Sequence, residues 1–121
     1  MPSPRARVGR SAEIAAAAEL GKRGYKIITS NYRCRFGEID LIANHGDSLV
    51  FVEVRCRRSL EYGTAAESVT PAKQRKIAAT AQHYLSQFNI NDTNCRFDVV
   101  EVSEKDGKLY VSDVITDAFG I

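Results

Sequence analysis

Five segments of the chain have the alternating or continuous apolar pattern of β-strands. The strongest are 37–42 and 49–55, which are joined by a polar stretch dense in turn-forming residues. These two segments predict a β-hairpin. Weaker patterns of the same kind predict strands over 25–32, 96–102 and 109–115.

Two further segments have the signals of α-helices. The first is predicted from Ser11, a residue type that caps helix N-termini, to Leu20. The second begins at Thr70 and Pro71, a capping hydroxyl followed by proline at the first helical position, and continues to Phe88. The order helix, three strands, helix, two strands predicts an α/β protein with one mixed sheet covered on both faces. The second helix is long enough to cross over between parallel strands.

Length and composition fit one domain with one hydrophobic core, since the chain has 121 residues of which 44% are hydrophobic. Residues 1–9 are basic and contain two prolines, so we expect a flexible arm before a single domain over 10–121. No apolar run approaches the roughly 20 residues of a membrane helix, and the N-terminus lacks the apolar segment of a signal peptide. We therefore expect a cytoplasmic protein with no membrane partner.

The three cysteines do not predict a metal site. No two of them have the C-x₂-C spacing that is typical of structural zinc. Cys56 and Cys95 fall in predicted strands, where a buried, reduced thiol is the ordinary expectation. His83 lies beside the core face of the second helix and is expected to be partly packed.

Charged residues interrupt both strands of the predicted hairpin. Asp40 lies in the middle of the first strand, and Glu53 and Arg55 lie side by side on one face of the second. Buried carboxylates are costly unless a cation or a metal accompanies them. Asp40 and Glu53 come from adjacent antiparallel strands, so we expect them to lie close together. Two explanations remain open: a hard-oxygen site for magnesium or manganese, or a structural network in which Arg55 neutralises both carboxylates.

Two other carboxylates have simpler explanations. Asp98 also lies within a predicted strand, and Arg96 shares its face, so we expect a structural ion pair there. Glu13 lies in the first turn of the first predicted helix, where a carboxylate complements the helix dipole.

Basic residues flank the hairpin and open the second helix, where cations oppose the helix dipole. If the carboxylates hold a metal, these cations can bind nucleic-acid phosphates; the alternative is a solvated basic face. The candidate nucleic-acid contacts are Arg33, Arg35, Arg57, Arg58, Lys73, Arg75 and Lys76.

Taken together, several motifs resemble the bacterial YraN family, and the resemblance covers nearly the whole chain. They are the Gly-x-x-x-Glu of 9–13, the Gly-Glu-Ile-Asp-Leu-Ile of 37–42, the Val-Phe-Val-Glu-Val-Arg of 50–55 and the Arg-Phe-Asp-Val-Val of 96–100. That family is similar to restriction-endonuclease-like nucleases, including the archaeal type of Holliday-junction resolvase.

The resemblance implies a restriction-endonuclease-like core, with a mixed five-stranded sheet, helices on both faces and a PD-(D/E)xK-type site. Asp40 would be the motif aspartate and Glu53 the motif glutamate, both ligating magnesium, with manganese as a substitute. Glu13 would match a glutamate that resolvase-like members add from the first helix. Gln74, or Lys73 beside it, would match the auxiliary polar residue on the helix after the motif.

Arg55 stands where the superfamily motif has lysine. Arginine keeps its proton, so Arg55 can clamp a phosphate but is a poor general base, and the metal alone would activate water. The resemblance implies a magnesium-dependent nuclease acting on DNA, with branched or repair intermediates as candidate substrates and a homodimer as a candidate assembly. The alternative is a nuclease-fold module that binds nucleic acid or a protein partner without efficient cleavage.

Overall fold

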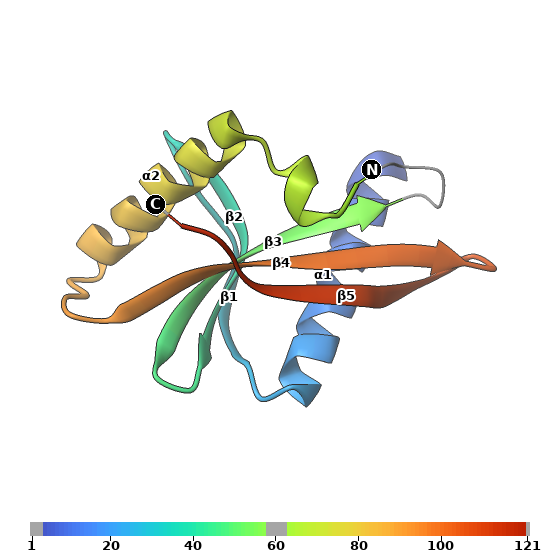
Figure 1. The fold of residues 1–121 in the computed structure, drawn as a ribbon, viewed down its shortest axis with the longest axis horizontal. Helices are drawn as coiled ribbons and strands as arrows, with labels where there is room; N and C mark the ends of the chain where they lie inside the picture. Colours follow the sequence, from blue (N-terminus) through green and yellow to red (C-terminus); the bar gives the residue numbers. More distant parts are fainter. Residues whose placement is uncertain (1–3, 58–62, 121) are drawn as a thin grey trace.

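The computed structural model describes residues 4–57 and 63–120, which form two α-helices, one short 3₁₀ helix and five strands (Figure 1). In chain order the elements are α1 (Pro4–Lys22), β1 (Lys26–Cys34), β2 (Gly37–His45), β3 (Ser48–Arg57), η1 (Ala66–Ser68), α2 (Pro71–Gln87), β4 (Asn94–Lys105) and β5 (Lys108–Phe119).

The strands form one mixed sheet in the order β1-β2-β3-β4-β5. β3 and β4 are parallel, and the other neighbouring pairs are antiparallel. α2 connects the parallel pair, as the sequence predicts. The expected α/β class, with a mixed five-stranded sheet, is therefore confirmed, and the architecture is consistent with a restriction-endonuclease-like core.

Each face of the sheet is covered by one helix. On one face, α1 contributes Ala12, Ala16 and Leu20 to a core with alternate residues of the central strands. On the other face, α2 contributes Ile77, Ala81 and Tyr84. The central strands are buried on both sides, which explains the continuous apolar run of β3. The sheet residues of the two cores are Leu41, Ala43, Val50, Val52, Val100 and Val102 beneath α1, and Ile39, Ile42, Leu49, Phe51, Phe97 and Val99 beneath α2.

The first helix begins at Pro4, not at the predicted Ser11. Residues 4–9, which were expected to belong to a flexible arm, are therefore helical, and residues 1–3 lie outside the described part of the chain. The signal was available, because Ser3-Pro4 repeats the Thr70-Pro71 pattern and proline favours the first helical position. Glu13 is consequently far from the first turn, and the helix dipole does not explain it.

The second helix begins as predicted, with the Thr70 hydroxyl accepting a hydrogen bond from the Lys73 backbone N–H at 3.2 Å. Cys56 and Cys95 lie in strands as predicted, each one residue from a strand end, but the burial expected for them is wrong, since both are exposed. Across residues 4–57 and 63–120, neither helix has the length and apolar composition needed to cross a membrane.

The sheet is irregular where β2 and β3 separate. Their pairing runs from His45 opposite Ser48 to Leu41 opposite Val52 and ends there. Ile39 and Leu41 are two residues apart, yet they belong to the cores on opposite faces. Because residues two apart on a regular strand share a face, the strand must rotate at the residue between them, Asp40. The irregularity places Asp40 between the two faces of the sheet.

Candidate metal centre

The Asp40 side chain replaces a backbone hydrogen-bond acceptor for the neighbouring strand, β3. Its Oδ2 accepts a hydrogen bond from the Val54 backbone N–H at 2.8 Å, just beyond the point where β2 and β3 stop pairing. The side chain thereby satisfies a backbone donor that the separation of the strands would leave unpaired. Burial raises the pKa of Asp40, and the Val54 hydrogen bond opposes that rise.

Glu53 lies next to Asp40 and is nearly inaccessible, with 8% of its surface exposed. Burial, followed by the negative charge of Asp40, raises the pKa of Glu53 to about 8. A hydrogen bond between the two carboxyl groups favours the carboxylate on Asp40 and the neutral acid on Glu53. Burial and the neighbouring negative charge therefore disfavour two ionised carboxylates side by side and favour a proton shared by the pair.

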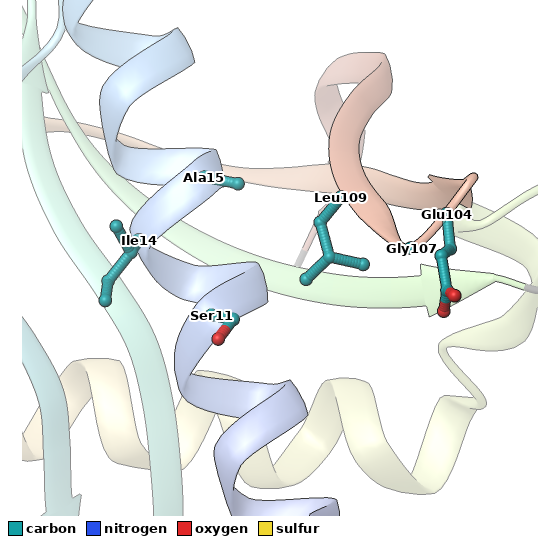
Figure 2. Close-up of a pocket in the computed structure, with 6 residues that line it drawn as sticks. All are labelled: Ser11, Ile14, Ala15, Glu104, Gly107 and Leu109. Carbon is teal, nitrogen blue, oxygen red and sulfur yellow. The ribbon is translucent and has the colours of Figure 1, made fainter.

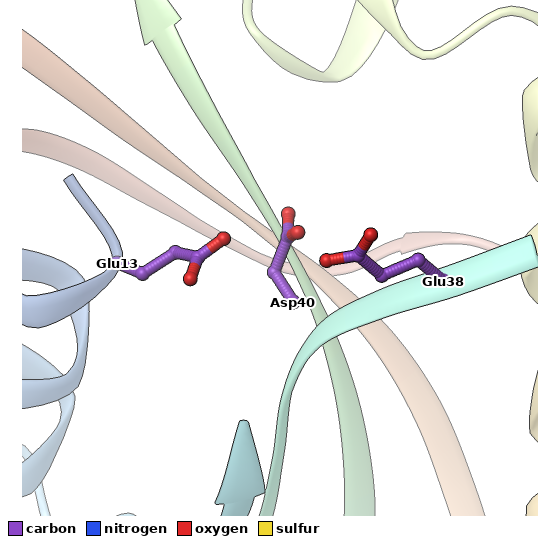
Figure 3. Close-up of side chains that lie close together, drawn as sticks. All are labelled: Glu13, Glu38 and Asp40. Carbon is purple, nitrogen blue, oxygen red and sulfur yellow. The ribbon is translucent and has the colours of Figure 1, made fainter. Parts of the chain in front are cut away.

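Two more carboxylates reach Asp40, one from α1 and one from β2. One oxygen from each of Glu13, Glu38 and Asp40 lies within 4.8 Å of the others. Figure 3 shows Asp40 between the two glutamates. Burial and the charge of Asp40 raise the pKa of Glu13, while a hydrogen bond with Asn31 lowers it. The structure thus brings Glu13, Asp40 and Glu53 together. Glu13 and Asp40 belong to the three-carboxylate group with Glu38, whereas Glu53 contacts Asp40 of that group.

Arg55 forms only a long ion pair with this cluster. Its Nε lies 4.0 Å from Glu53 Oε1, and its charge lowers the pKa of Glu53. Within residues 4–57 and 63–120 this buried Nε has no hydrogen-bond partner, so the compact network of the ion-pair explanation is not formed. A cluster of carboxylate oxygens suits a hard divalent ion such as magnesium, which takes oxygen ligands. The donor set therefore fits the metal that the family resemblance implies.

The two candidates on the second helix differ in what they contact. The Gln74 side-chain amide donates to the Val69 carbonyl at 3.0 Å, so it anchors the segment before α2. The Lys73 ammonium lies close enough to lower the pKa of both Asp40 and Glu53. Lys73, and not Gln74, is the α2 residue whose charge acts on the site.

The basic residues flanking the hairpin have several different partners. Arg33 forms a 3.0 Å ion pair with Glu38, which connects it to the carboxylate cluster. Arg35 places its guanidinium carbon 4.8 Å from the centre of the Phe36 ring. Arg57 donates to the carbonyls of residues 64 and 63 at 2.7 and 3.0 Å, so it supports the following loop. Arg75 and Lys76 are exposed on α2, and Arg58 lies outside the described residues.

Asp98 has the structural role that the sequence predicts. Arg96 donates to both of its carboxylate oxygens, at 3.0 and 3.1 Å. The Tyr25 hydroxyl donates at 2.7 Å and the Asp117 backbone N–H at 2.9 Å. Arg96 also contacts His45 Nδ1 at 2.8 Å, so this network links the ends of four strands.

A separate pocket lies between α1 and the β4–β5 turn (Figure 2). None of the carboxylates around Asp40 is among its described lining residues. It therefore adds nothing to the metal centre. The pocket is lined by Ser11, Ile14, Ala15, Glu104, Gly107 and Leu109.

Sequence reasoning missed two residues of the site, Glu38 and Asn31. Glu38 had a signal, because it stands two residues before Asp40 in the same predicted strand. Asn31 had none: it reaches Glu13 from a left-handed backbone conformation (φ 55°) opposite the irregular part of β2. A regular strand pattern does not predict that conformation.

Comparison with known proteins identifies relatives over most of the chain. The model of the family described as "Uncharacterised protein family UPF0102" matches residues 12–102. A UPF0102 protein of Symbiobacterium thermophilum is 54% identical over 104 residues, covering 85% of this chain and 88% of the relative. A UPF0102 protein of Chloroflexus aurantiacus is 45% identical over 121 residues, covering 99% and 98%. A UPF0102 protein of Syntrophus aciditrophicus is 48% identical over 113 residues, covering 93% and 88%.

Proposed function

The chain belongs to the UPF0102 family, also known as YraN, and from its buried carboxylates we propose that it is a magnesium-dependent nuclease that hydrolyses DNA phosphodiester bonds. The observation that carries the proposal is the convergence of four carboxyl groups, Glu13, Glu38, Asp40 and Glu53, around one partly buried point, while Arg55 approaches Glu53 only to 4.0 Å. A structural ion pair would place its cation in direct hydrogen-bond contact, as Arg96 does with Asp98. Branched and repair intermediates are the candidate substrates.

In the proposed site Asp40, Glu53 and Glu13 hold the metal. A bound magnesium ion would lower the pKa of a water and stabilise the charge that develops on the phosphate. Glu53 must release its proton before it can act as a ligand, and Lys73 favours that release by lowering the pKa of the pair. Arg55 keeps its charge at all relevant pH values and has a buried Nε with no partner, so its role is to bind the phosphate.

The test is cleavage of duplex, single-stranded and branched DNA by wild type and by Asp40→Asn. Asparagine keeps an oxygen for the Val54 N–H but removes the charge that a metal needs. We expect at least a hundredfold loss of magnesium-dependent cleavage, which is the order of effect of removing a key electrostatic group. Asp113→Asn, at an exposed position of β5, is the matched control and should cleave like wild type. Equal activity of wild type and Asp40→Asn would reject the proposed site.

A second candidate function is a DNA-binding module without efficient cleavage. Arg55 favours this second function. It stands at the position of the motif lysine, and an arginine keeps its proton and so cannot act as a general base there. The second function predicts salt-dependent DNA binding that is the same in magnesium and in EDTA, and the same for Asp40→Asn. Binding that requires both magnesium and Asp40 would exclude it.

A further inference from the structure

An exposed aromatic ring stands at the turn between β1 and β2, which lies beside α2 (Figure 1). Phe36 is 40% exposed. Its ring edge meets His83, with ring centres 6.3 Å apart, and the Arg35 guanidinium lies 4.8 Å from its centre. Among the described residues, Phe36 differs from the other exposed large apolar side chains in having both a guanidinium and an imidazole against its ring.

The ring stands on a rigid support. His83 Nδ1 is 2.6 Å from the Tyr32 hydroxyl, and Tyr32 packs edge-on against Tyr84 in the α2 core. The turn is also held close to α2 at Gly37. A Cβ on Gly37 would lie 3.2 Å from the Thr80 hydroxyl, and its φ of 154° is one that other residues rarely adopt. Phe36 is therefore presented in a defined position.

The surroundings of Phe36 are those of a surface that meets phosphates. Arg35 and Arg33 belong to the same hairpin, and the Cβ of Lys76 on α2 approaches Gly37. Arg35 covers one face of the ring and is exposed, so its guanidinium can turn to a phosphate and release that face. Aromatic rings stack on nucleobases, and such stacking accepts any base.

The distance from Phe36 to the proposed metal site sets how many nucleotides separate a stacked base from the scissile phosphate. Phe36 lies in the turn just before β2 and four residues before Asp40, so the backbone between them spans at most about 13 Å. Successive nucleotides of one strand rise by about 3.4 Å in a duplex and by more when the strand is extended. A base on Phe36 would therefore lie about two to four nucleotides from a phosphate at the metal centre.

Building on the proposed nuclease function, we propose that Phe36 is a base-stacking site that selects DNA with an unpaired nucleotide two to four positions from the scissile phosphate. Bases inside a continuous duplex already stack on their neighbours and do not present a free face. Forked, flapped or junction DNA does present one. Phe36 thus assigns a substrate class to the site, while the exposed cations Arg35 and Lys76 hold the adjacent backbone; Arg33 is already paired with Glu38.

The experiment measures binding, not cleavage. Forked DNA with 2-aminopurine at unpaired positions one to five from the branch is titrated with protein in EDTA and again in magnesium, beside a continuous duplex. We expect wild type to quench 2-aminopurine at a subset of these positions. Phe36→Leu, which keeps the apolar volume but not the ring, should lose about fivefold to a hundredfold in affinity for the fork. Its affinity for the duplex should change less than twofold.

Two variants control the interpretation. Phe36→Tyr keeps a ring and should bind the fork like wild type. Phe88→Leu removes another exposed phenylalanine, at the far end of α2, and should have no effect. The proposal is rejected if wild type quenches no position, if it binds neither DNA, or if Phe36→Leu weakens fork and duplex equally. If wild type stacks the base but does not cleave DNA, the stacking site is retained and the nuclease function is rejected. If cleavage of forked DNA is unchanged in Phe36→Leu and no base is stacked, the nuclease function is retained and the stacking site is rejected.

Discussion

The sheet contains two aspartates in buried strands, and they have opposite surroundings. Asp98 is fully buried and receives hydrogen bonds from Arg96, Tyr25 and the Asp117 backbone. Asp40 receives one backbone hydrogen bond and lies among carboxyl groups, and the nearby cation Lys73 acts on it only through its charge. Burial of a carboxylate is common to both, so burial alone does not identify a functional site. The supply of counter-charge separates the structural aspartate from the one available to a metal.

The largest effect expected from this comparison is on stability at Asp98. Asp98→Ala leaves the Arg96 guanidinium and the Tyr25 hydroxyl without their acceptor, and we expect a loss of about 3–5 kcal/mol in the free energy of unfolding. Urea denaturation measures it. Asp113→Ala, at an exposed position, should change the same quantity by less than about 0.5 kcal/mol. A loss below about 1 kcal/mol at Asp98 would show that the two aspartates are not energetically different.

The second expected effect is a gain in stability when Glu53, in the candidate metal site, is replaced by glutamine. The pKa of Glu53 is raised from 4.5 to about 8, so the neutral acid is the favoured form in the folded protein. Its contribution to stability is complete below about pH 4.5 and is lost as the pH rises through about 8. Glu53→Gln stays neutral and should be more stable than wild type at pH 8–9 by on the order of a few kcal/mol, without magnesium.

Thermal or urea unfolding of both proteins from pH 5 to pH 9 measures this difference, which should grow with pH. The pKa values of Asp40 and Glu13 are raised in the same direction, so wild type should keep losing stability over part of this range. Parallel stability curves for the two proteins would contradict the shared-proton description.

The smallest effect sharpens the role of α2. Lys73→Met removes the cation that lowers the pKa of Asp40 and Glu53, so both groups should titrate at higher pH. Carboxyl ¹³C chemical shifts followed by NMR measure the titration. Arg75→Met, an exposed cation on the same helix, is the matched control and should leave both titrations unchanged. A shift of equal size in both variants would mean that the general charge of α2 is responsible.

Much of the fold follows from patterns that are local in sequence. The hairpin, the crossover helix with its Thr70 cap, and the structural pairing of Asp98 with Arg96 each depend on spacings of a few residues. The start of α1 at Pro4 was also readable, but the alanine-rich stretch after Ser11 gave the stronger signal.

The details of the site depend on geometry that spacing does not contain. The rotation of β2 at Asp40 brings Glu13 from one face and Glu53 from the other to the same carboxylate. Strand periodicity assumes no such rotation, so it predicted the Asp40–Glu53 pair and could have included Glu38, but it could not predict the part played by Asn31. The Gln74 amide was assigned to the site by position, whereas its distance to the Val69 carbonyl shows an anchoring contact.

The hydrogen bond between Asp40 and Val54 also bears on how such a protein can change over time. Its acceptor is one oxygen, and an asparagine at the same position would still offer one. A single codon change from aspartate to asparagine would therefore remove the charge at this position while leaving the Val54 N–H its acceptor. If the proposed nuclease function holds, a descendant could lose cleavage in one such step and still keep the fold and the surface at Phe36.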